Sequence, residues 1–140
     1  TFGPRWTNPH LIPHILQELK TGGTVRLGNL SACRDLIYVE DAVAALLKLA
    51  GLSCGFETFN VGTGSATSVR ELLQILEELR GKPIDILQED KRLRALDRPY
   101  LCADSTKLSR LTGWRPVWSL RQGLQALLQQ EEILAEGIRG

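Results

Sequence analysis

The chain of 140 residues contains no methionine and only three cysteines, Cys33, Cys54 and Cys102. Because translation starts at methionine, a chain that begins at Thr1 and has none is expected to be a processed or excised part of something longer. The cysteines are odd in number and form no C-x-x-C pair. They therefore predict reduced thiols in a cytoplasmic protein rather than a disulfide framework.

Long apolar runs and a large net charge are also missing. No run of about 18 apolar residues predicts a membrane-spanning helix, and no secretory signal pattern opens the chain. The formal net charge is only +1, which gives no global field to attract nucleic acid or a strongly basic partner. The 43% apolar and 24% charged residues are ordinary for one globular domain with a core. We therefore expect neither a nucleic-acid partner nor a membrane partner.

Aromatic residues are scarce, at 6% of the chain. Trp6, Trp114 and Trp118 lie too far apart to form a stacking platform for bases, so we interpret them as packing residues. His10 and His14 have a spacing that can hold a metal. No cysteine or carboxylate accompanies them at ligand spacing, and the sequence predicts no metal site. The thiols lack a nearby histidine base, so no nucleophilic cysteine is predicted either.

Hydrophobic periodicity and turn residues predict strands that alternate with helices, which is typical of the α/β class. Ser68 and Glu71 form the S-x-x-E pattern of a capping box, and Asp104 and Ser119 are expected to cap later helices. The predicted helices cover 9–20, 41–50, 68–80, 105–112 and 119–135. The predicted strands cover 24–27, 35–39, 57–61, 82–88 and 100–103.

A glycine turn at 61–67, VGTGSAT, partly matches the dinucleotide fingerprint, and Asp85 follows about 20 residues later. Thr67 occupies the position where the fingerprint needs a small residue for close packing of helix on strand. We therefore favour a plain glycine turn that leads into a helix. Its backbone N–H groups could still face a ligand.

Arg34 begins the predicted strand 35–39, and Arg94 lies in an arginine-rich loop that ends at Pro99. A guanidinium can bind a phosphate or carboxylate through two parallel hydrogen bonds. Two fixed arginines could thus clamp a diphosphate, although an isolated surface arginine is commonly only a solvated charge.

Several further pieces of sequence occur in the order known from one enzyme family. The chain resembles the C-terminal part of extended short-chain dehydrogenase/reductases, the NAD-dependent epimerase/dehydratase family that acts on nucleotide sugars. The pieces are TFGPR at 1–5, HLIP at 10–13, LGN at 27–29 with RDLIYVED at 34–41, FNVGTG at 59–64, and RALD at 94–97 followed by AD at 103–104, KL at 107–108, LTGWRP at 111–116 and LRQGL at 120–124.

The resemblance implies an α/β fold made of a substrate lobe and the last strands and helices of a Rossmann-type doubly wound sheet. Residues 1–140 would form one incomplete domain without its N-terminal cofactor-binding half. The implied contacts are with the diphosphate, sugar, base and ribose of a nucleotide sugar. The residues expected to make them are Arg34, Arg94, Asn60, His10, Leu11, Val25, Leu27, Asp97 and Arg98.

Two departures from the family pattern leave part of this assignment open. The family commonly has proline where this chain has Ala95, and Arg98 precedes a proline instead, so either Arg94 or Arg98 could be the phosphate ligand. His10 stands where relatives often carry lysine or asparagine.

The catalytic residues of the family are not found. Its cofactor loop G-x-x-G-x-x-G and its Y-x-x-x-K pair are absent, because Tyr38 is followed four positions later by Ala42, and Tyr100 by Asp104. The resemblance therefore implies that NAD or NADP is bound by the N-terminal half, that no catalytic residue lies here, and that this fragment alone is inactive.

The segment 27–31 before the Arg-Asp pair looks most like hexose 4,6-dehydratases, whereas the LTGW tail also resembles deoxyhexose reductases and some epimerases. A non-catalytic nucleotide-sugar-binding module and an inactive fragment remain alternatives, and a homodimer is possible. Without the other half, we expect the apolar faces at Leu46/Leu49 and Leu72/Leu76 to be uncovered.

Overall fold

The computed structural model describes residues 1–5, 10–22, 24–53, 55–89 and 98–137, and the side chains of this set up to residue 131. The chain forms two compact units. We refer to Thr1–Pro4, Asp35–Ala66 and Leu101–Gly140 as unit 1, and to Arg5–Arg34 and Thr67–Tyr100 as unit 2.

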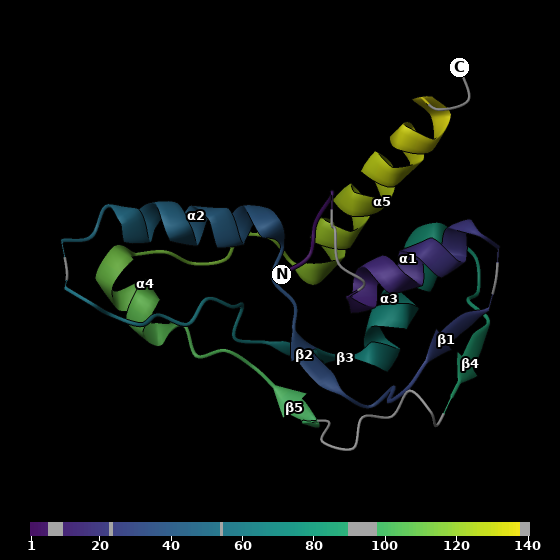
Figure 1. The fold of residues 1–140 in the computed structure, drawn as a ribbon, viewed down its shortest axis with the longest axis horizontal. Helices are drawn as coiled ribbons and strands as arrows, with labels where there is room; N and C mark the ends of the chain where they lie inside the picture. The colour runs from purple at the N-terminus through teal and green to yellow at the C-terminus, as the bar shows by residue number, and fades with distance from the viewer. Residues whose placement is uncertain (6–9, 23, 54, 90–97, 138–140) are drawn as a thin grey trace. The chain divides into compact units, whose positions relative to one another are not determined.

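Unit 2 contains a pair of parallel strands and two helices (Figure 1). Strand β1 (Val25–Leu27) pairs with β4 (Ile86–Gln88) in the register Val25 to Ile86. Helices α1 (Leu11–Lys20) and α3 (Val69–Arg80) are amphipathic and bury one face each. The buried side chains of this unit include Ile12, Ile15, Leu16, Val25, Leu27, Leu72, Leu73, Leu76 and Ile84.

Both ends of α3 follow the sequence prediction. The Ser68 hydroxyl accepts a hydrogen bond from the Glu71 N–H at 3.2 Å, and the Glu71 carboxylate accepts one from the Ser68 N–H at 2.8 Å. Gly81 then ends the helix with φ of +64°, a left-handed conformation that costs glycine little. The predicted capping box is confirmed.

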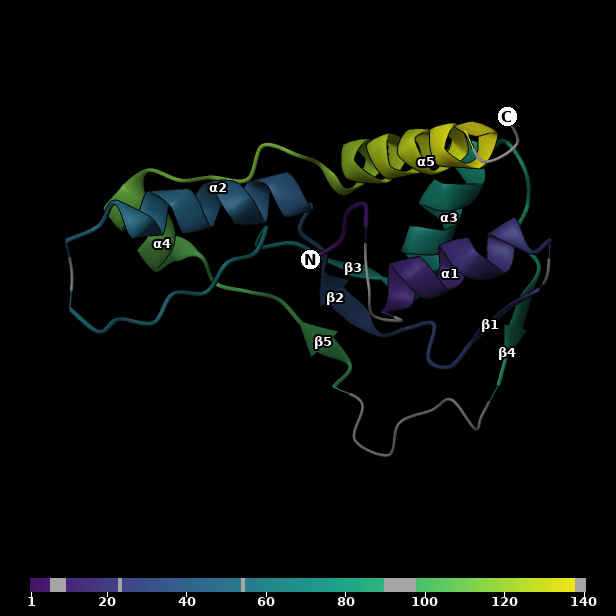
Figure 2. The same ribbon diagram turned by 45° about the horizontal axis from the view of Figure 1, so that its top comes forward.

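Unit 1 is built on α2 (Val39–Ala50), α4 (Thr106–Thr112) and α5 (Leu120–Gly137). Figures 1 and 2 show α4 beside α2. A small core of Ile37, Ala45, Leu108 and Trp114 lies in this unit, with Phe59 and Val61 packed against it. Ser119 caps α5 as predicted, because its hydroxyl accepts from the Gln122 N–H at 3.2 Å.

Asp41 is the one charged side chain buried among the described residues, at 2% exposure. Its two carboxylate oxygens accept the N–H groups of Val117 and Trp118, both at 3.0 Å, and its carbonyl accepts the Trp114 indole N–H at 3.2 Å. One residue on α2 thereby fixes the segment between α4 and α5. The predicted packing role of Trp114 is confirmed.

The structure also contains a short sheet with the strand order β3-β2-β5. It consists of β2 (Cys33–Asp35), β3 (Ala66–Ser68) and β5 (Tyr100–Leu101). The structure also forms an isolated parallel bridge between Phe2 and Tyr38.

Three sequence predictions of secondary structure are wrong. The strand expected at 35–39 is β2, which ends at Asp35, and α2 already starts at Val39, where the first-turn acids Glu40 and Asp41 favour a helix N-terminus. Residues 57–61 form no strand, since no described segment makes ladder hydrogen bonds with them. Ser105, not Asp104, is the N-cap of α4.

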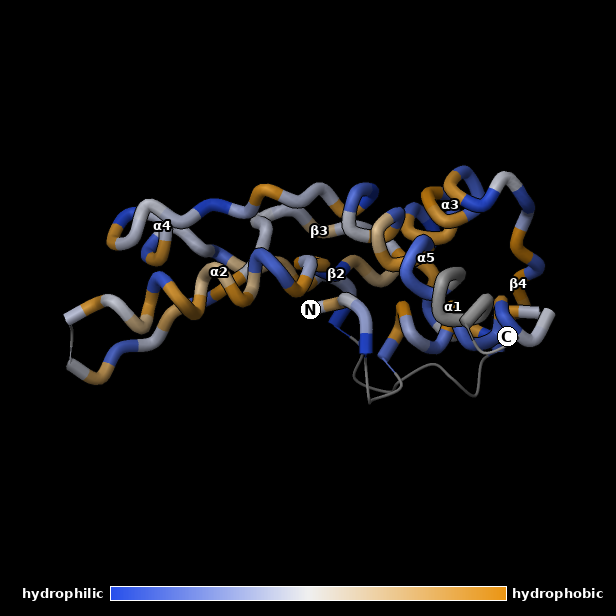
Figure 3. Tube along the Cα trace, turned by 90° about the horizontal axis from the view of Figure 1, so that it is seen from above, coloured by the Kyte–Doolittle hydropathy of each residue, from blue (hydrophilic) through white to orange (hydrophobic). Residues whose placement is uncertain are grey.

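The prediction about uncovered apolar faces is half right. Leu72 and Leu76 are fully buried inside unit 2, so that part is wrong. On α2, Leu49 is half-buried, whereas Val43, Leu46 and Leu47 are 47%, 62% and 71% exposed. We refer to these three as the open face of α2, a helix whose hydrophobic residues are visible in Figure 3. No helix among the described residues is long and apolar enough to cross a membrane.

Candidate functional site

Arg34 lies in the middle of β2 rather than at the start of a strand, and its side chain is half-buried. Its Nη1 donates to two backbone carbonyls, those of Cys33 and Arg98, each at 2.8 Å. A guanidinium carries five N–H donors in one plane, so these two bonds fix the orientation of the plane. The structure therefore ties Arg34 to the end of the arginine-rich segment, 64 residues later in the chain.

Of the candidate phosphate ligands after Arg34, the structure describes Arg98, whose side chain is exposed. Cys33 donates its N–H to the carbonyl of the next residue, Pro99, at 2.8 Å, so β2 holds the backbone on this side of Arg98. Arg94 and Asp97 lie outside the described residues. Their predicted roles stay predictions.

His10 and Leu11 stand at the start of α1 in unit 2. His10 is the N-cap residue, is exposed, and makes no side-chain capping bond, while Leu11 is half-buried. His14, the other histidine of the predicted pair, has its Nε2 2.9 Å from the Arg26 carbonyl oxygen and 3.8 Å from the Glu18 carboxylate. The described residues contain no group of three metal-ligating side chains.

Val25 and Leu27, expected to flank the base, have buried side chains on β1. Arg26 between them is exposed and pairs with Glu18 at 3.9 Å. The exposed residue of this strand is thus Arg26, whose N–H donates to the Glu18 carboxylate at 3.0 Å and whose carbonyl lies 2.9 Å from the His14 Nε2. Asn60, expected to contact the substrate at the lobe interface, is exposed in unit 1, whereas the candidates described above lie in unit 2.

The glycine turn at 62–64 is held by Asp35, a residue for which the sequence predicted no role. One Asp35 oxygen accepts from the N–H and the hydroxyl of Thr63 at 2.9 and 2.6 Å, and the other accepts from the N–H groups of Gly64 and Ala103 at 2.9 and 3.2 Å. The Gly62 N–H donates to the Ser105 hydroxyl at 3.0 Å. The expectation that these N–H groups could face a ligand is therefore wrong.

Gly62 is needed at its position because of this same carboxylate. A Cβ there would lie 2.6 Å from the Asp35 Oδ2 and 2.5 Å from the Ala103 Cβ. The glycine pattern thus serves close packing inside the protein and not a phosphate. The sequence signal that could have pointed to this role is the pair Arg34-Asp35, because Asp35 is the residue that accepts the hydrogen bonds of the turn.

Comparison with known proteins places this arrangement in a family. The sequence profile of the family described as GDP-mannose 4,6 dehydratase matches residues 2–127. The chain belongs to this NAD-dependent epimerase/dehydratase family. A UDP-glucose 4-epimerase of Mycolicibacterium smegmatis is 34% identical over 128 residues, which cover 88% of this chain and 40% of that protein.

Solved structures of the epimerase/dehydratase fold agree with this assignment. RMD from Pseudomonas aeruginosa, complexed with NADPH, superposes with a TM-score of 0.81 at 26% identity over 94% of this chain and 46% of its own. MoeE5 in complex with UDP-glucuronic acid and NAD gives 0.86 at 27% identity over 95% and 44%. The chain therefore spans less than half the length of these relatives.

The two tyrosines of this epimerase/dehydratase chain differ in their surroundings. Tyr38 is buried between Phe2 and Trp118, with ring centroids 5.5 and 4.6 Å away. Burial, and to a lesser degree the charge of Glu40, raises the pKa of the Tyr38 phenol. The ring is a packing element, and Tyr100 on β5 is exposed.

Proposed function

We propose that this chain is the C-terminal, substrate-binding part of an NAD(P)-dependent nucleotide-sugar enzyme. Its role is to hold the diphosphate of the nucleotide sugar while another part of a longer protein carries the cofactor and the Tyr/Lys chemistry. The observation that carries the proposal is the pair of bonds from Arg34 to Cys33 and Arg98, in a chain of this family. These bonds hold the guanidinium plane of Arg34 beside the backbone of Arg98, which is a second cationic residue.

The glycine turn of this chain does not fit the diphosphate of NAD or NADP, because Asp35 and Ser105 accept the three N–H groups at 62–64. The cofactor is therefore assigned to the part of the protein outside this chain. In the family that this chain resembles, the NAD or NADP cofactor takes a hydride from the sugar and returns it.

Among the reactions of the family, we favour a hexose 4,6-dehydratase. Support comes from the segment 27–31 before the Arg-Asp pair and from the description of the matching family. A nucleotide-sugar 4-epimerase is the second candidate, favoured by the 34% identity to a UDP-glucose 4-epimerase. NADPH in RMD and NAD in MoeE5 allow either cofactor.

Calorimetric titration of the full-length protein with UDP-, GDP- and dTDP-sugars tests substrate binding. We expect one of them to bind, and the Arg34→Gln variant to bind it about 10- to 100-fold more weakly, since a hydrogen bond to a charged group contributes about 1.5–3 kcal/mol. Arg70→Gln removes an exposed arginine of α3 and is the matched control. The absence of heat with every sugar nucleotide would overturn the proposal.

Two further measurements test the parts of the proposal separately. The first tests whether Arg34 acts on the phosphates, and the second tests whether the protein carries the catalytic motifs. Arg34→Gln should leave affinity for the nucleoside without phosphates nearly unchanged, whereas an equal loss for both ligands would mean that Arg34 acts only through the fold. Reading the gene upstream of these residues tests the enzymatic part. A glycine-rich loop and a Tyr-x-x-x-Lys pair are expected there, and finding neither would favour a non-catalytic binding module.

A further inference from the structure

Lys107, in the first turn of α4, contacts three successive residues of the segment before the glycine turn. Its Nζ donates to the Glu57 carboxylate at 2.6 Å and to the Thr58 carbonyl at 3.0 Å. The same Nζ lies 4.6 Å from the centre of the Phe59 ring, which is within the range of a cation–π interaction. All four residues belong to unit 1. A single ammonium group therefore holds residues 57–59 to α4.

The ion pair of Lys107 with Glu57 lies at the surface. The two side chains are 47% and 48% exposed. Water and salt screen such a pair, and holding two long side chains in one arrangement costs entropy, so its contribution to the free energy of unfolding is small. The physical consequence of the three contacts is therefore the orientation of the segment rather than a large gain in stability.

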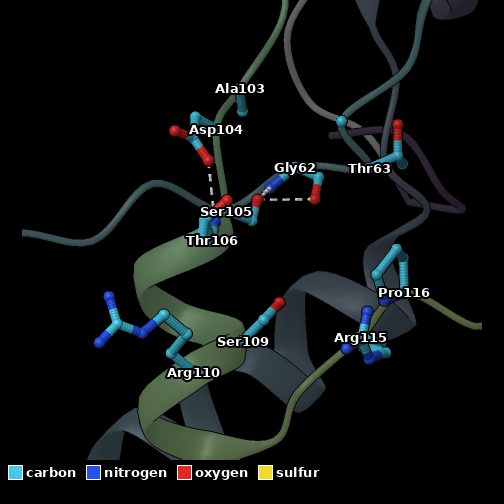
Figure 4. Close-up of a pocket in the computed structure, with 11 residues that line it drawn as sticks. Gly62, Thr63, Ala103, Asp104, Ser105, Thr106, Ser109, Arg110, Arg115 and Pro116 are labelled. Carbon is cyan, nitrogen blue, oxygen red and sulfur yellow. Dashed lines mark hydrogen bonds between the residues drawn. The ribbon is translucent and has the colours of Figure 1, made fainter.

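The start of α4 holds the chain again on the other side of Asn60. The hydroxyl of Ser105, the N-cap residue of α4, donates to the Gly62 carbonyl at 2.9 Å and accepts the Gly62 N–H at 3.0 Å (Figure 4). Only Asn60 and Val61 lie between the two stretches that α4 holds. The backbone of Asn60 is thus fixed from both directions.

The side chain of Asn60 is turned outward by the packing of its two neighbours. Phe59 and Val61 are half-buried and pack against the core of unit 1, whereas Asn60 between them is exposed. This alternation is that of an extended segment, in which successive side chains point to opposite sides. Among the described residues, none makes a hydrogen bond with the Asn60 side chain. Its amide has two N–H donors and a carbonyl acceptor, which are left to solvent or to a ligand.

We propose that Lys107 is a positioning residue for Asn60 in nucleotide-sugar binding, an inference that rests on the proposed function, in which Asn60 contacts the substrate. By holding residues 57–59 to α4, Lys107 keeps the Asn60 amide in one orientation before the substrate arrives. This lowers the entropy cost of binding. The Nζ of Lys107 is already directed at Glu57 and Thr58, so its effect on the substrate passes through Asn60.

A double-mutant cycle in calorimetry on the full-length protein tests this role, with whichever of UDP-glucose, GDP-mannose and dTDP-glucose binds most tightly. Lys107→Met keeps the aliphatic part of the side chain and removes the ammonium. We expect it to weaken binding about three- to tenfold, and Asn60→Ala to weaken binding at least as much. The double variant should bind within about twofold of Asn60→Ala alone, because without the amide Lys107 has nothing left to position.

Two more variants separate positioning from a general effect on the fold. Lys107→Arg retains a cation that can pair with Glu57 and cover the Phe59 ring, so it should bind within about threefold of the unmodified protein. The control Lys48→Met removes an exposed lysine of α2, also in unit 1, and should change the affinity less than about twofold. An additive cycle, or equal losses in Lys107→Met and Lys48→Met, would overturn the proposal.

Hydrogen exchange of the ligand-free full-length protein tests the positioning without a substrate. Lys107→Met should speed the exchange of the peptide that contains residues 57–61 and leave α3 unchanged, and equal exchange in both proteins would contradict the proposal. If none of the three nucleotide sugars binds, the proposed function fails and this inference fails with it. If one binds and Arg34→Gln weakens it while Lys107→Met does not, the proposed function stands and this inference alone fails.

Discussion

Asp35 and Asp41 belong to the same short segment, and the carboxylates of both accept hydrogen bonds from backbone N–H groups of distant loops. Asp35 accepts from the turn at 63–64 and from Ala103, while Asp41 accepts from Val117 and Trp118. A buried N–H that loses its acceptor costs more than the bond contributed. These carboxylates therefore act as structural acceptors, and Arg34 in the middle of β2 is left as the candidate ligand.

Asp41→Ala is expected to destabilise the protein by about 2–4 kcal/mol, because two loop N–H groups lose a largely desolvated carboxylate. Urea unfolding followed by tryptophan fluorescence measures the change. Glu40→Ala is the matched control, since Glu40 is an exposed acid in the same helical turn and should cost less than about 1 kcal/mol. Equal effects of the two variants would contradict the structural role of Asp41.

Gly123→Ala is expected to destabilise the protein by about 1–2 kcal/mol, although alanine is the better helix former. A Cβ at Gly123 on α5 would lie 2.7 Å from the Phe2 Cζ and 2.9 Å from the Tyr38 Cδ2. Overpacking against two buried rings thus outweighs the gain in propensity. Thermal unfolding checks the sign, and Gly51→Ala, whose Cβ would meet only a carbonyl at 3.7 Å, should be neutral or stabilising.

At the scale of elements, α3 shows how far local signals reach. The sequence S-x-x-E followed by an apolar period and Gly81 predicts both ends of the helix, and both predictions are confirmed. The reason is that the cap, the periodicity and the left-handed stop are all satisfied within the segment itself. No distant partner is required.

The capping box also predicts a dependence on pH. Hydrogen bonds from Ser68, first from its N–H and then from its hydroxyl, hold the pKa of Glu71 below its ordinary value of 4.5. As pH falls, the unfolded chain takes up the proton before the folded one. The contribution of Glu71 is therefore complete above pH 4.5 and is lost as the pH drops through the lowered pKa of the folded state.

Glu71→Gln should consequently lower the urea midpoint at pH 7 and have a much smaller effect at pH 3. The control Asp85→Asn removes another exposed carboxylate of unit 2 and shows the effect of losing a surface charge alone. A loss of stability in Glu71→Gln that is the same at both pH values would argue that packing, and not the charge, matters at this position.

The strand prediction at 57–61 failed for the opposite reason. Alternation and β-branched residues describe a surface that suits a sheet, but a strand exists only where another strand offers a ladder of hydrogen bonds. Among the described residues none does so for Thr58, Phe59 or Asn60. In the same way, the apolar residues before Val39 predict a strand, although Glu40 and Asp41 after them favour the N-terminus of α2.

At the scale of the whole molecule, the open face of α2 is the feature that the chain alone leaves without cover. Val43, Leu46 and Leu47 are exposed, while Leu108 and Trp114, which pack with Ala45 of α2, are buried. The chain spans 36–46% of the lengths of related proteins. Apolar area of this kind is normally buried against another surface.

We expect the isolated 140-residue chain to self-associate through this face. Sedimentation velocity should show species larger than a monomer, and the triple variant V43Q/L46Q/L47Q should shift them toward the monomer. Because these side chains are already exposed, the variant should cost the fold itself little. A cooperatively unfolding monomer formed by the unmodified chain would contradict this expectation.

The candidate site was predictable only in part. Family motifs pointed to Arg34, and the structure adds what motifs do not encode, namely its bonds to the carbonyls of Cys33 and Arg98. The burial of Val25 and Leu27 and the use of the glycine turn by Asp35 depend on contacts between segments far apart in sequence.

The position of Cys102 gives the protein a built-in reporter of local opening. Its sulfur lies 3.8 Å from the Asp35 Oδ2 and is half-buried beside the glycine turn, and the thiol is free. We expect alkylation of this thiol to become faster when the turn parts from Asp35, so that the labelling rate, read peptide by peptide in a mass spectrometer, follows this opening. No engineered label is needed to follow the motion of this loop in the native protein.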